Sequence, residues 1–267
     1  MNQEENYIET NKKAWNSKVQ HHLESSFYDL PGFLDGKNSL KEIELQLLGN
    51  IKDKSVLHLQ CHFGQDTISL SRLGANATGV DFSDIAIKEA KKLAIETNSA
   101  TKFICCDVYD LPNHLNEKFD IIFTSYGTIG WLPDLDKWAK IISNFLKPNG
   151  KFVFVEFHPV VWMFDDDFSK IEYNYFNTDA IVEKTEGSYA DKNATISNTN
   201  ITWNHSLSEV INSLINNGLN ILKFEEYNYS PYNCFNNTLE IEPGKFIIKN
   251  IGDKIPMTFA IHAIKTN

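Results

Sequence analysis

The stretch from Ser55 to Asp84 constrains the fold more than any other part of the chain. It reads S-V-L-H-L-Q-C-H-F-G-Q-D-T-I-S-L-S-R-L-G-A-N-A-T-G-V-D-F-S-D. An apolar run is followed by a polar turn that ends at Gly64, then by a helical pattern, and then by a second apolar run that ends in Asp81. This order is typical of a β-loop-α-β unit, whose loop after the first strand receives a ligand.

The two ends of this unit favour a nucleoside with an anionic tail. Main-chain N–H groups at the start of the helix after Gly64 attract a carboxylate or phosphate, because they face outward with the positive end of the helix dipole. A carboxylate at the tip of the next strand, here Asp81, accepts hydrogen bonds from the hydroxyls of a ribose.

The turn itself discriminates between nucleosides. Dinucleotide-binding turns carry G-x-G-x-x-G because the main chain must approach a pyrophosphate closely. Here Gln60 and His62 occupy the turn, so side chains stand where that approach would occur. A tail with a single carboxylate, as in S-adenosyl-L-methionine, is less demanding. An NAD-dependent oxidoreductase and a catalytically silent nucleoside-binding protein stay open as alternatives.

Four motifs together resemble a branch of the class I S-adenosylmethionine-dependent methyltransferases that act on small molecules. They read L-H-L-Q-C-H-F-G-Q-D, G-V-D-F-S-D, C-D-V-Y-D-L-P and F-D-I-I-F-T-S-Y-G. The resemblance covers most of the chain and is firmest from Ser55 to Pro159. The first motif is a variant, because His58 replaces an acid and Gln60 and His62 replace glycines.

The alternation of strands and helices predicts an α/β fold, a doubly wound, seven-stranded Rossmann-like sheet. Expected strands lie near residues 55–59, 76–80, 101–105, 119–124, 151–157, 219–227 and 257–264, and expected helices near 66–73, 84–96, 134–146 and 206–217. The last two strands match the pair, one of them inverted, that closes the sheet in the family. We expect one domain over residues 1–267, made of a helical cap (1–50), a cofactor-binding core (51–159), a substrate roof (160–205) and a C-terminal part of the sheet (206–267).

Local residue patterns predict helices in the cap and a hairpin in the substrate roof. The cap is expected to hold a helix over Asn6 to Leu23 and a second helix that begins at Ser39, with Glu42 completing a capping box. Residues 180–189 and 194–203 alternate around a polar turn, which suggests an antiparallel hairpin above the ligand crevice. Residues 228–255 read as a long linker that is ordered over the pocket.

Composition limits the partners. The formal net charge of −10 disfavours nucleic acid, because such binding depends on Lys and Arg neutralising phosphates. No run approaches the roughly 18 apolar residues that a membrane span needs. The polar start and the four cysteines, which lack C-x-x-C spacing, suggest a cytoplasmic protein with reduced thiols. The oligomeric state stays open.

Cofactor contacts are expected from the loop, from the strand tips and from the cap. The predicted residues are Trp15, Gln60, Cys61, His62, Gly64, Gln65, Asp81, Phe82, Ser83, Asp107, Val108 and Ser125. Asp81 is expected to hold the ribose, although D-F-S-D also fits a helix cap. Asp107 is placed to accept from an adenine amino group, or else is a turn acid. Trp15 is a lid residue or a core residue.

Catalysis of methyl transfer needs little covalent help, because the sulfonium already activates the methyl group. Holding the nucleophile in line and excluding water supply much of the effect. The resemblance places residues after the fourth strand toward the methyl group, and we take Tyr126 as one catalytic candidate. His158 is the other, as a base for an acceptor that holds its proton, with Glu156 or His205 behind it. No metal is expected, because the acids at 165–167 read as a solvated charge run.

Overall fold

A seven-stranded sheet forms the centre of the chain. The structure, a computed structural model, describes residues 6–177 and 179–266, so residues 1–5 of the expected cap lie outside it. The strand order is β3-β2-β1-β4-β5-β11-β8. The strands are β1 (Ser55–Leu59), β2 (Asn76–Asp81), β3 (Lys102–Cys105), β4 (Phe119–Ser125), β5 (Leu146–Phe157), β8 (Leu219–Tyr227) and β11 (Thr258–Lys265). Strands β1 to β5 pair in parallel, whereas β11 is antiparallel to both of its neighbours. The expected sheet with one inverted strand is confirmed.

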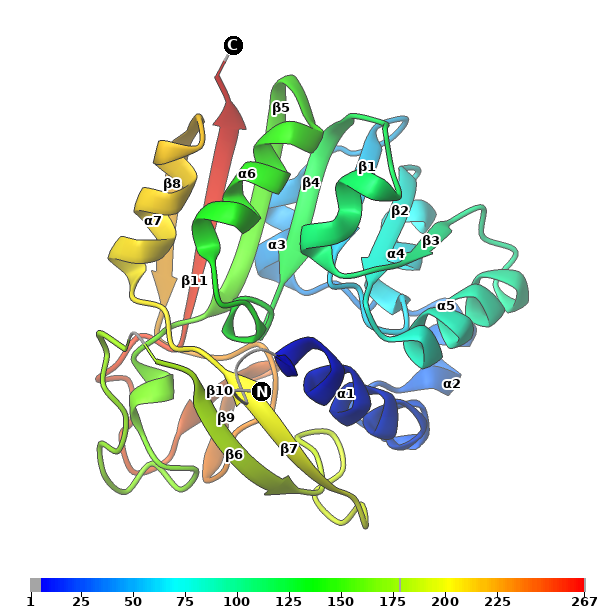
Figure 1. The fold of residues 1–267 in the computed structure, drawn as a ribbon. Helices are drawn as coiled ribbons and strands as arrows, with labels where there is room; N and C mark the ends of the chain where they lie inside the picture. Colours follow the sequence, from blue (N-terminus) through cyan, green and yellow to red (C-terminus); the bar gives the residue numbers. More distant parts are fainter. Residues whose placement is uncertain (1–5, 178, 267) are drawn as a thin grey trace.

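Helices cover both faces of the sheet (Figure 1). Helices α6 (Leu135–Phe145) and α7 (Leu207–Asn216) pack on one face, and α3 (Glu42–Leu48), α4 (Gln65–Arg72) and α5 (Asp84–Glu96) pack on the other. Along β5, Phe152 and Phe154 join the core under α6, whereas Val153 and Val155 join the core under α3. An apolar run without alternation is therefore what this strand needs, because both of its faces are buried.

The second helix of the cap starts later than the sequence predicts. Helix α3 follows Lys41, whose N–H donates to the Glu44 carboxylate at 2.7 Å. The expected cap residue, Ser39, instead has its hydroxyl 2.9 Å from that of Ser69 in α4. The predicted capping box from Ser39 to Glu42 is wrong, because a contact between two helices engages the serine before it can cap one.

The carboxyl ends of the parallel strands are covered by segments from three parts of the chain (Figure 1). They are α1 (Tyr7–Glu24) with the short α2 (Leu30–Leu34), the antiparallel hairpin β6 (Ile181–Glu186) and β7 (Ser197–Thr202), and a second hairpin, β9 (Thr238–Glu242) and β10 (Lys245–Ile248). Asn11 joins α1 to β7, because its amide donates to the Ile201 carbonyl at 2.7 Å and accepts from the Ile201 N–H at 2.9 Å. We call these covering segments the roof, which is a larger set than the residues 160–205 that the sequence predicts for it.

The hairpin β9–β10 departs from the predicted linker over residues 228–255. Two short alternating runs flank Pro243 and Gly244, and Gly244 has a φ of +73°. The turn itself is visible in the sequence, but the strands on either side have only 5 and 4 residues and give a weak pattern. Short 3-10 helices within the described residues include η2 (Val108–Asn113), η3 (Ile129–Trp131) and η4 (Val161–Met163). Over the described part of the chain, no helix has the length and apolarity to cross a membrane.

Candidate functional site

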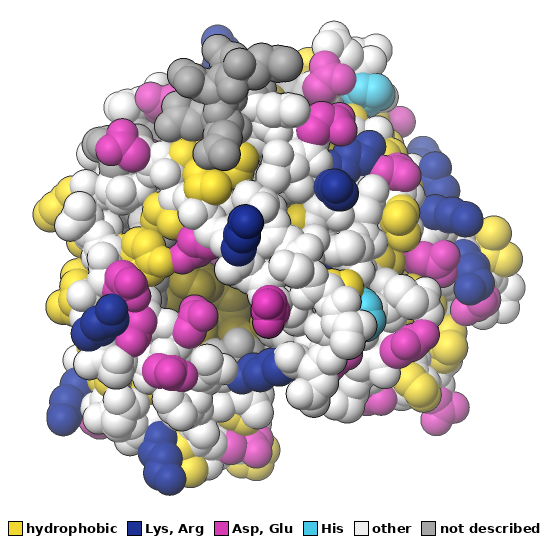
Figure 2. Space-filling model, turned by 60° about the horizontal axis from the view of Figure 1, so that its bottom comes forward, with side chains coloured by type: hydrophobic (Ala, Val, Ile, Leu, Met, Phe, Trp, Pro, Cys, Tyr) yellow, Lys and Arg dark blue, Asp and Glu magenta, His cyan; other side chains and the backbone are white. Residues whose placement is uncertain are grey.

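A cavity of about 770 Å³ lies between the carboxyl ends of the strands and the roof. Its lining comes from the ends of β1, β2, β4 and β5, from α1, from the hairpin β6–β7 and from the loop before β9. Figure 2 shows this face of the molecule, with a hollow whose base is hydrophobic. Ligands of open α/β sheets bind at this edge.

The loop after β1 keeps a glycine-like backbone although two of its residues have side chains. Gln60 and His62 have φ angles of +56° and +51°, and Gly64 has +83°. A Cβ on Gly64 would lie 2.5 Å from the Phe103 ring, so only glycine fits there. The Gln60 amide donates to the Thr128 carbonyl at 2.8 Å. The side chain at position 60 therefore reaches across to the β4–η3 loop.

His58 occupies the place of the family's acid. It is buried, and its Nδ1 lies 2.9 Å from the hydroxyl of Thr67 in α4. Burial lowers its pKa to about 3, so the ring is neutral at pH 7. His58 is thus a satisfied interior histidine that also lines the cavity.

Asp81 lies at the tip of β2 and lines the cavity. One carboxylate oxygen accepts from the His62 N–H at 2.8 Å, and the other accepts from the Ser83 N–H at 2.9 Å. Burial raises the pKa of Asp81 to about 6, while the backbone donors oppose this shift. A carboxylate offers about four lone-pair positions, so acceptor capacity remains for two ligand hydroxyls.

Asp107 and Val108 begin the turn after β3, beside Phe82 in the cavity lining. The Asp107 carboxylate accepts from the Tyr109 N–H at 2.6 Å and so caps η2. Burial raises the pKa of Asp107. Asp107 therefore acts as a turn acid and is also placed where it could accept from an adenine amino group, because it caps η2 and lines the cavity.

Two of the predicted site residues are not brought into the cavity. The Ser83 hydroxyl caps α5 by accepting from the Ala86 N–H at 3.0 Å, and it donates to Asn16 at 2.6 Å. His158 has Nε2 2.9 Å from a Glu226 carboxylate oxygen of β8, and its Nδ1 accepts from the Val160 N–H at 3.2 Å. Neither side chain lines the cavity, and both nitrogens of His158 are occupied.

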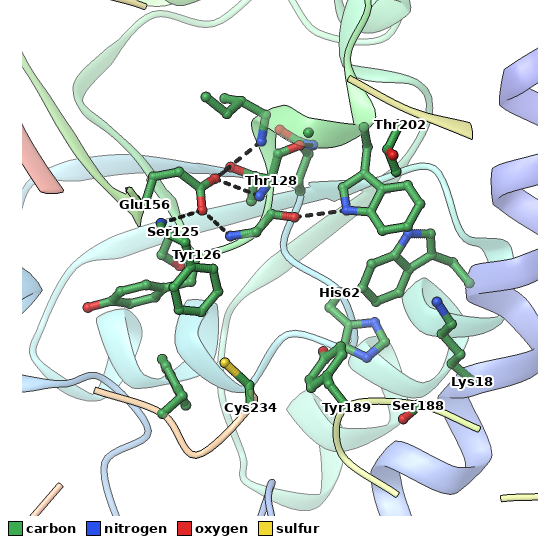
Figure 3. Close-up of a pocket in the computed structure, with 18 of the residues that line it drawn as sticks. Lys18, His62, Ser125, Tyr126, Thr128, Glu156, Ser188, Tyr189, Thr202 and Cys234 are labelled. Carbon is green, nitrogen blue, oxygen red and sulfur yellow. Dashed lines mark hydrogen bonds between the residues drawn. The ribbon is translucent and has the colours of Figure 1, made fainter. Parts of the chain in front are cut away.

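All of the other predicted residues line the cavity, including Trp15, Cys61, Gln65, Ser125 and Tyr126. The Tyr126 hydroxyl, however, donates to the buried Glu44 carboxylate at 2.8 Å. Figure 3 shows it turned away from His62 and Lys18 on the other side of the pocket. Its ring packs edge-on against Tyr232, with ring centroids 5.0 Å apart. Tyr126 contributes an aromatic wall rather than a free hydroxyl.

Glu156 organises the loop that follows β4 (Figure 3). Its buried carboxylate accepts from the backbone N–H groups of Gly127, of Thr128 at 2.7 Å and of Ile129 at 3.3 Å. The Thr128 hydroxyl at 3.0 Å and the Phe157 N–H at 2.7 Å also donate to it. With its lone pairs engaged, Glu156 holds the loop in place and is not available as a base.

Replacement of Glu156 by glutamine should therefore destabilise the fold. An amide offers one acceptor oxygen and places an NH₂ group against backbone donors, which leaves at least one buried N–H unsatisfied at a cost of about 2 kcal/mol. Urea unfolding of Glu156→Gln measures this loss. Glu172→Gln, on the exposed surface, is the matched control and should be neutral. Equal midpoints for the two variants would contradict the assigned role.

Many aromatic side chains line the remainder of the cavity. Phe157 and Phe235 pack edge-on with centroids 5.1 Å apart, and Tyr189 and Trp162 lie in the same lining. His205 also lines it, but Nε2 lies 2.8 Å from the Leu132 carbonyl and Nδ1 lies 2.9 Å from Glu209. Among residues 6–177 and 179–266, no three His, Cys, Asp or Glu side chains gather as a metal ion would require.

Lys18 lines the cavity although the sequence did not predict it as a site residue. The face of α1 toward the cavity presents Tyr7, Asn11, Trp15 and Lys18. Their helical spacing of three and four residues was available as a signal, because it places them on one side of α1. Phe27 and Tyr28, which follow α1, also line the cavity, whereas His22 does not and has its Nδ1 2.8 Å from His62 Nε2.

Comparison with known proteins agrees with this geometry. Residues 56–150 match the family model of a methyltransferase domain. A ubiquinone biosynthesis O-methyltransferase of Coxiella burnetii is 34% identical over 115 residues, 43% of this chain and 47% of that protein. Its counterpart from Idiomarina loihiensis is 26% identical over 136 residues, 49% of this chain and 56% of that protein. The chain thus spans about half the length of these relatives.

One solved structure extends the likeness to almost the whole chain. It is an S-adenosylmethionine-dependent methyltransferase from Clostridium acetobutylicum, with a TM-score of 0.57 and 18% identity. The alignment covers 96% of this chain and 99% of that one. At this identity the likeness concerns the fold.

Proposed function

We propose that this chain transfers a methyl group from S-adenosylmethionine to a small-molecule acceptor. The chain has the class I methyltransferase fold. Its residues 56–150 match the family model of a methyltransferase domain. The observation that supports the proposal best is the arrangement at the strand tips. Asp107, Asp81 and the Gly64 turn follow one another along one edge of the cavity. They suit, in that order, an adenine, a ribose and an amino-acid tail.

When bound, S-adenosylmethionine supplies a methyl group that its sulfonium already activates. The chain then has to bind, orient and exclude water, which favours an in-line displacement through proximity. The β4–η3 loop, fixed by Glu156, and the aromatic walls would hold the acceptor. Ring faces such as those of Tyr126 and Trp131 also suit a positive charge. Our proposal assigns no general base, because the Tyr126 hydroxyl is directed at Glu44 and His158 lies outside the cavity.

A turnover experiment tests this function. The purified protein is incubated with S-adenosylmethionine and a panel of small hydroxyl, amine and thiol compounds, and release of S-adenosylhomocysteine is measured. We expect release with at least one acceptor. Binding of S-adenosylhomocysteine without any turnover across the panel would contradict an enzyme and leave a nucleoside-binding protein.

Tyr126→Phe should retain kcat within about threefold, because the hydroxyl serves Glu44 and not the acceptor. The same change should lower stability by about 1 to 2 kcal/mol, since the buried carboxylate loses a donor. Both quantities are measured on one preparation, with Tyr232→Phe as the aromatic control. A 100-fold loss of kcat at unchanged KM would instead assign Tyr126 to proton transfer.

The affinity for S-adenosylhomocysteine should fall as the pH is lowered through about 6, the pKa of Asp81 in the free protein. Above that pH the carboxylate is ionised and accepts from the ribose, whereas below it a proton occupies an acceptor position. His62 and His22 do not titrate in this range, because burial lowers their pKa values to about 3 and about 2. Calorimetry between pH 7.5 and 5 measures the change. Asp81→Asn should remove it, and an unchanged slope in that variant would refute the assignment.

Location and partners belong to the same proposal. The four cysteines are free, which agrees with a reducing cytoplasm. The net charge of −10 favours a small molecule over nucleic acid as acceptor.

A further inference from the structure

Lys18 is a buried cation without a counter-ion. Lys18 is 6% exposed. Its ammonium lies 5.0 Å from the ring centroid of Trp15 and 5.5 Å from that of Trp131. Burial lowers its pKa to about 8, so the group is still mostly protonated at pH 7. Across the described residues, no carboxylate lies within ion-pair distance and no acceptor within hydrogen-bond distance of it. Ring faces compensate a buried charge only in part.

His62 presents a second hydrogen-bond donor to the cavity. This follows from the positions of the protons in the hydrogen bonds that link Ser188, His22 and His62. The Ser188 hydroxyl oxygen accepts from the N–H groups of Ala190 at 3.1 Å and Asp191 at 3.3 Å, which uses its two lone pairs. Its O–H therefore donates to His22 Nε2 at 2.9 Å. His22, which is fully buried, then carries its proton on Nδ1 and donates to His62 Nε2 at 2.8 Å.

The remaining proton of His62 must consequently lie on Nδ1. This nitrogen has no hydrogen-bond partner in the described part of the chain, and the His62 side chain lines the cavity. The Trp15 ring is close to both donors, because its centroid lies 5.3 Å from that of His62 and 5.0 Å from the Lys18 ammonium. Burial lowers the pKa of His62, and the positive charge of Lys18 lowers it further, which agrees with the proximity of the two residues. Figure 3 shows both residues on the same side of the pocket.

We propose that Lys18 and His62 form a carboxylate-binding subsite between α1 and the β1–α4 loop. The inference rests on the proposed function, because the carboxylate belongs either to the amino-acid tail of the cofactor or to the methyl acceptor. An ammonium and an oriented N–H that lack acceptors together match the two oxygens of one carboxylate. The aromatic walls of the cavity make an aromatic carboxylate a suitable acceptor probe.

Binding measurements with Lys18→Met test the subsite without turnover. Calorimetry compares S-adenosylhomocysteine with its decarboxylated analogue, and then benzoate with benzamide in the presence of S-adenosylhomocysteine. Lys13→Met, at an exposed position of the same helix, is the matched control. Lys18→Arg keeps the charge and should retain most of the carboxylate preference. For at least one of the two pairs of compounds, we expect Lys18→Met to lower the ratio of the affinity for the carboxylate to that for its neutral analogue by at least 10-fold.

The pattern of loss identifies the source of the carboxylate. A loss confined to S-adenosylhomocysteine assigns the subsite to the cofactor tail, and a loss confined to benzoate assigns it to the acceptor. Unchanged preferences in both pairs would overturn the subsite but leave the methyltransferase proposal intact. If the wild-type protein binds neither S-adenosylhomocysteine nor its decarboxylated analogue, both the subsite and the methyltransferase proposal are contradicted.

Nitrogen-15 NMR of the histidine rings tests the second donor independently of any variant at Lys18. We expect His62 in the free protein to be protonated at Nδ1 and unprotonated at Nε2. The Ser188→Ala variant removes the hydroxyl that donates to His22 Nε2. In this variant His62 should be a mixture of its two tautomers. A wild-type His62 protonated at Nε2 would overturn its role as a donor.

Discussion

Asp81→Ala is expected to weaken the binding of S-adenosylhomocysteine by about 100-fold, because two hydrogen bonds from ribose hydroxyls to a charged acceptor are lost. The carboxylate lies at the tip of β2 and lines the cavity together with residues of the Gly64 turn. Its raised pKa of about 6 still leaves it ionised at pH 7.5, the pH of the measurement. Calorimetry gives the affinity directly.

The matched control for this change is Asp84→Ala. Asp84 lies three residues further on, in the first turn of α5, and its carboxylate pairs with Lys12 at 3.1 Å outside the cavity. Its loss should change the affinity by less than about threefold, as expected for an exposed ion pair. Because Asp81 also accepts from the His62 N–H, the thermal midpoint is recorded for each variant. Equal affinities for Asp81→Ala and the wild type would contradict the ribose assignment.

Gly64→Ala should destabilise the fold by about 3 kcal/mol, of which about 1 reflects the left-handed backbone and the rest the clash. The new Cβ would lie 2.5 Å and 2.6 Å from two carbons of the Phe103 ring and 3.0 Å from the Ala90 Cβ. The ring belongs to β3 and is packed in the core under α5, so it has little space to move. Urea unfolding measures the loss.

Gly36→Ala separates the two contributions. Gly36 has a φ of +103°, yet a Cβ there would meet no atom within 4 Å. This variant should lose only the backbone part, about 1 kcal/mol. The double variant Gly64→Ala/Phe103→Leu should be less destabilised than the sum of its single changes, since the smaller side chain relieves the contact. Equal losses at Gly64 and Gly36 would show that the Phe103 contact is unimportant.

The parts of the fold that the sequence predicts well are those with a local cause. The apolar run of β5 reflects burial on both faces, and Asp81 is the last residue of its strand. The Gly64 turn is likewise visible, although Gln60 and His62 depart from glycine. Their positive φ angles show that the loop keeps its backbone shape with other residues.

The parts that the sequence does not predict depend on contacts between distant segments. His158 follows β5 as expected, but the pairing of β11 with β5 and β8 brings its ring to Glu226 rather than to the cavity. Ser39 has the residue type of a helix cap, and only the packing of α4 beside it reveals Ser69 as its partner. Tyr126 faces the cavity with its ring, yet Glu44 of α3 holds its hydroxyl.

The most direct test of the account is a crystal structure of the protein with S-adenosylhomocysteine. We expect both ribose hydroxyls within hydrogen-bond distance of the Asp81 carboxylate and the adenine against Val108, with the amino-acid tail at the turn that ends in Gly64. A nucleoside bound elsewhere, or a cleft left empty at saturating ligand, would contradict the central claim.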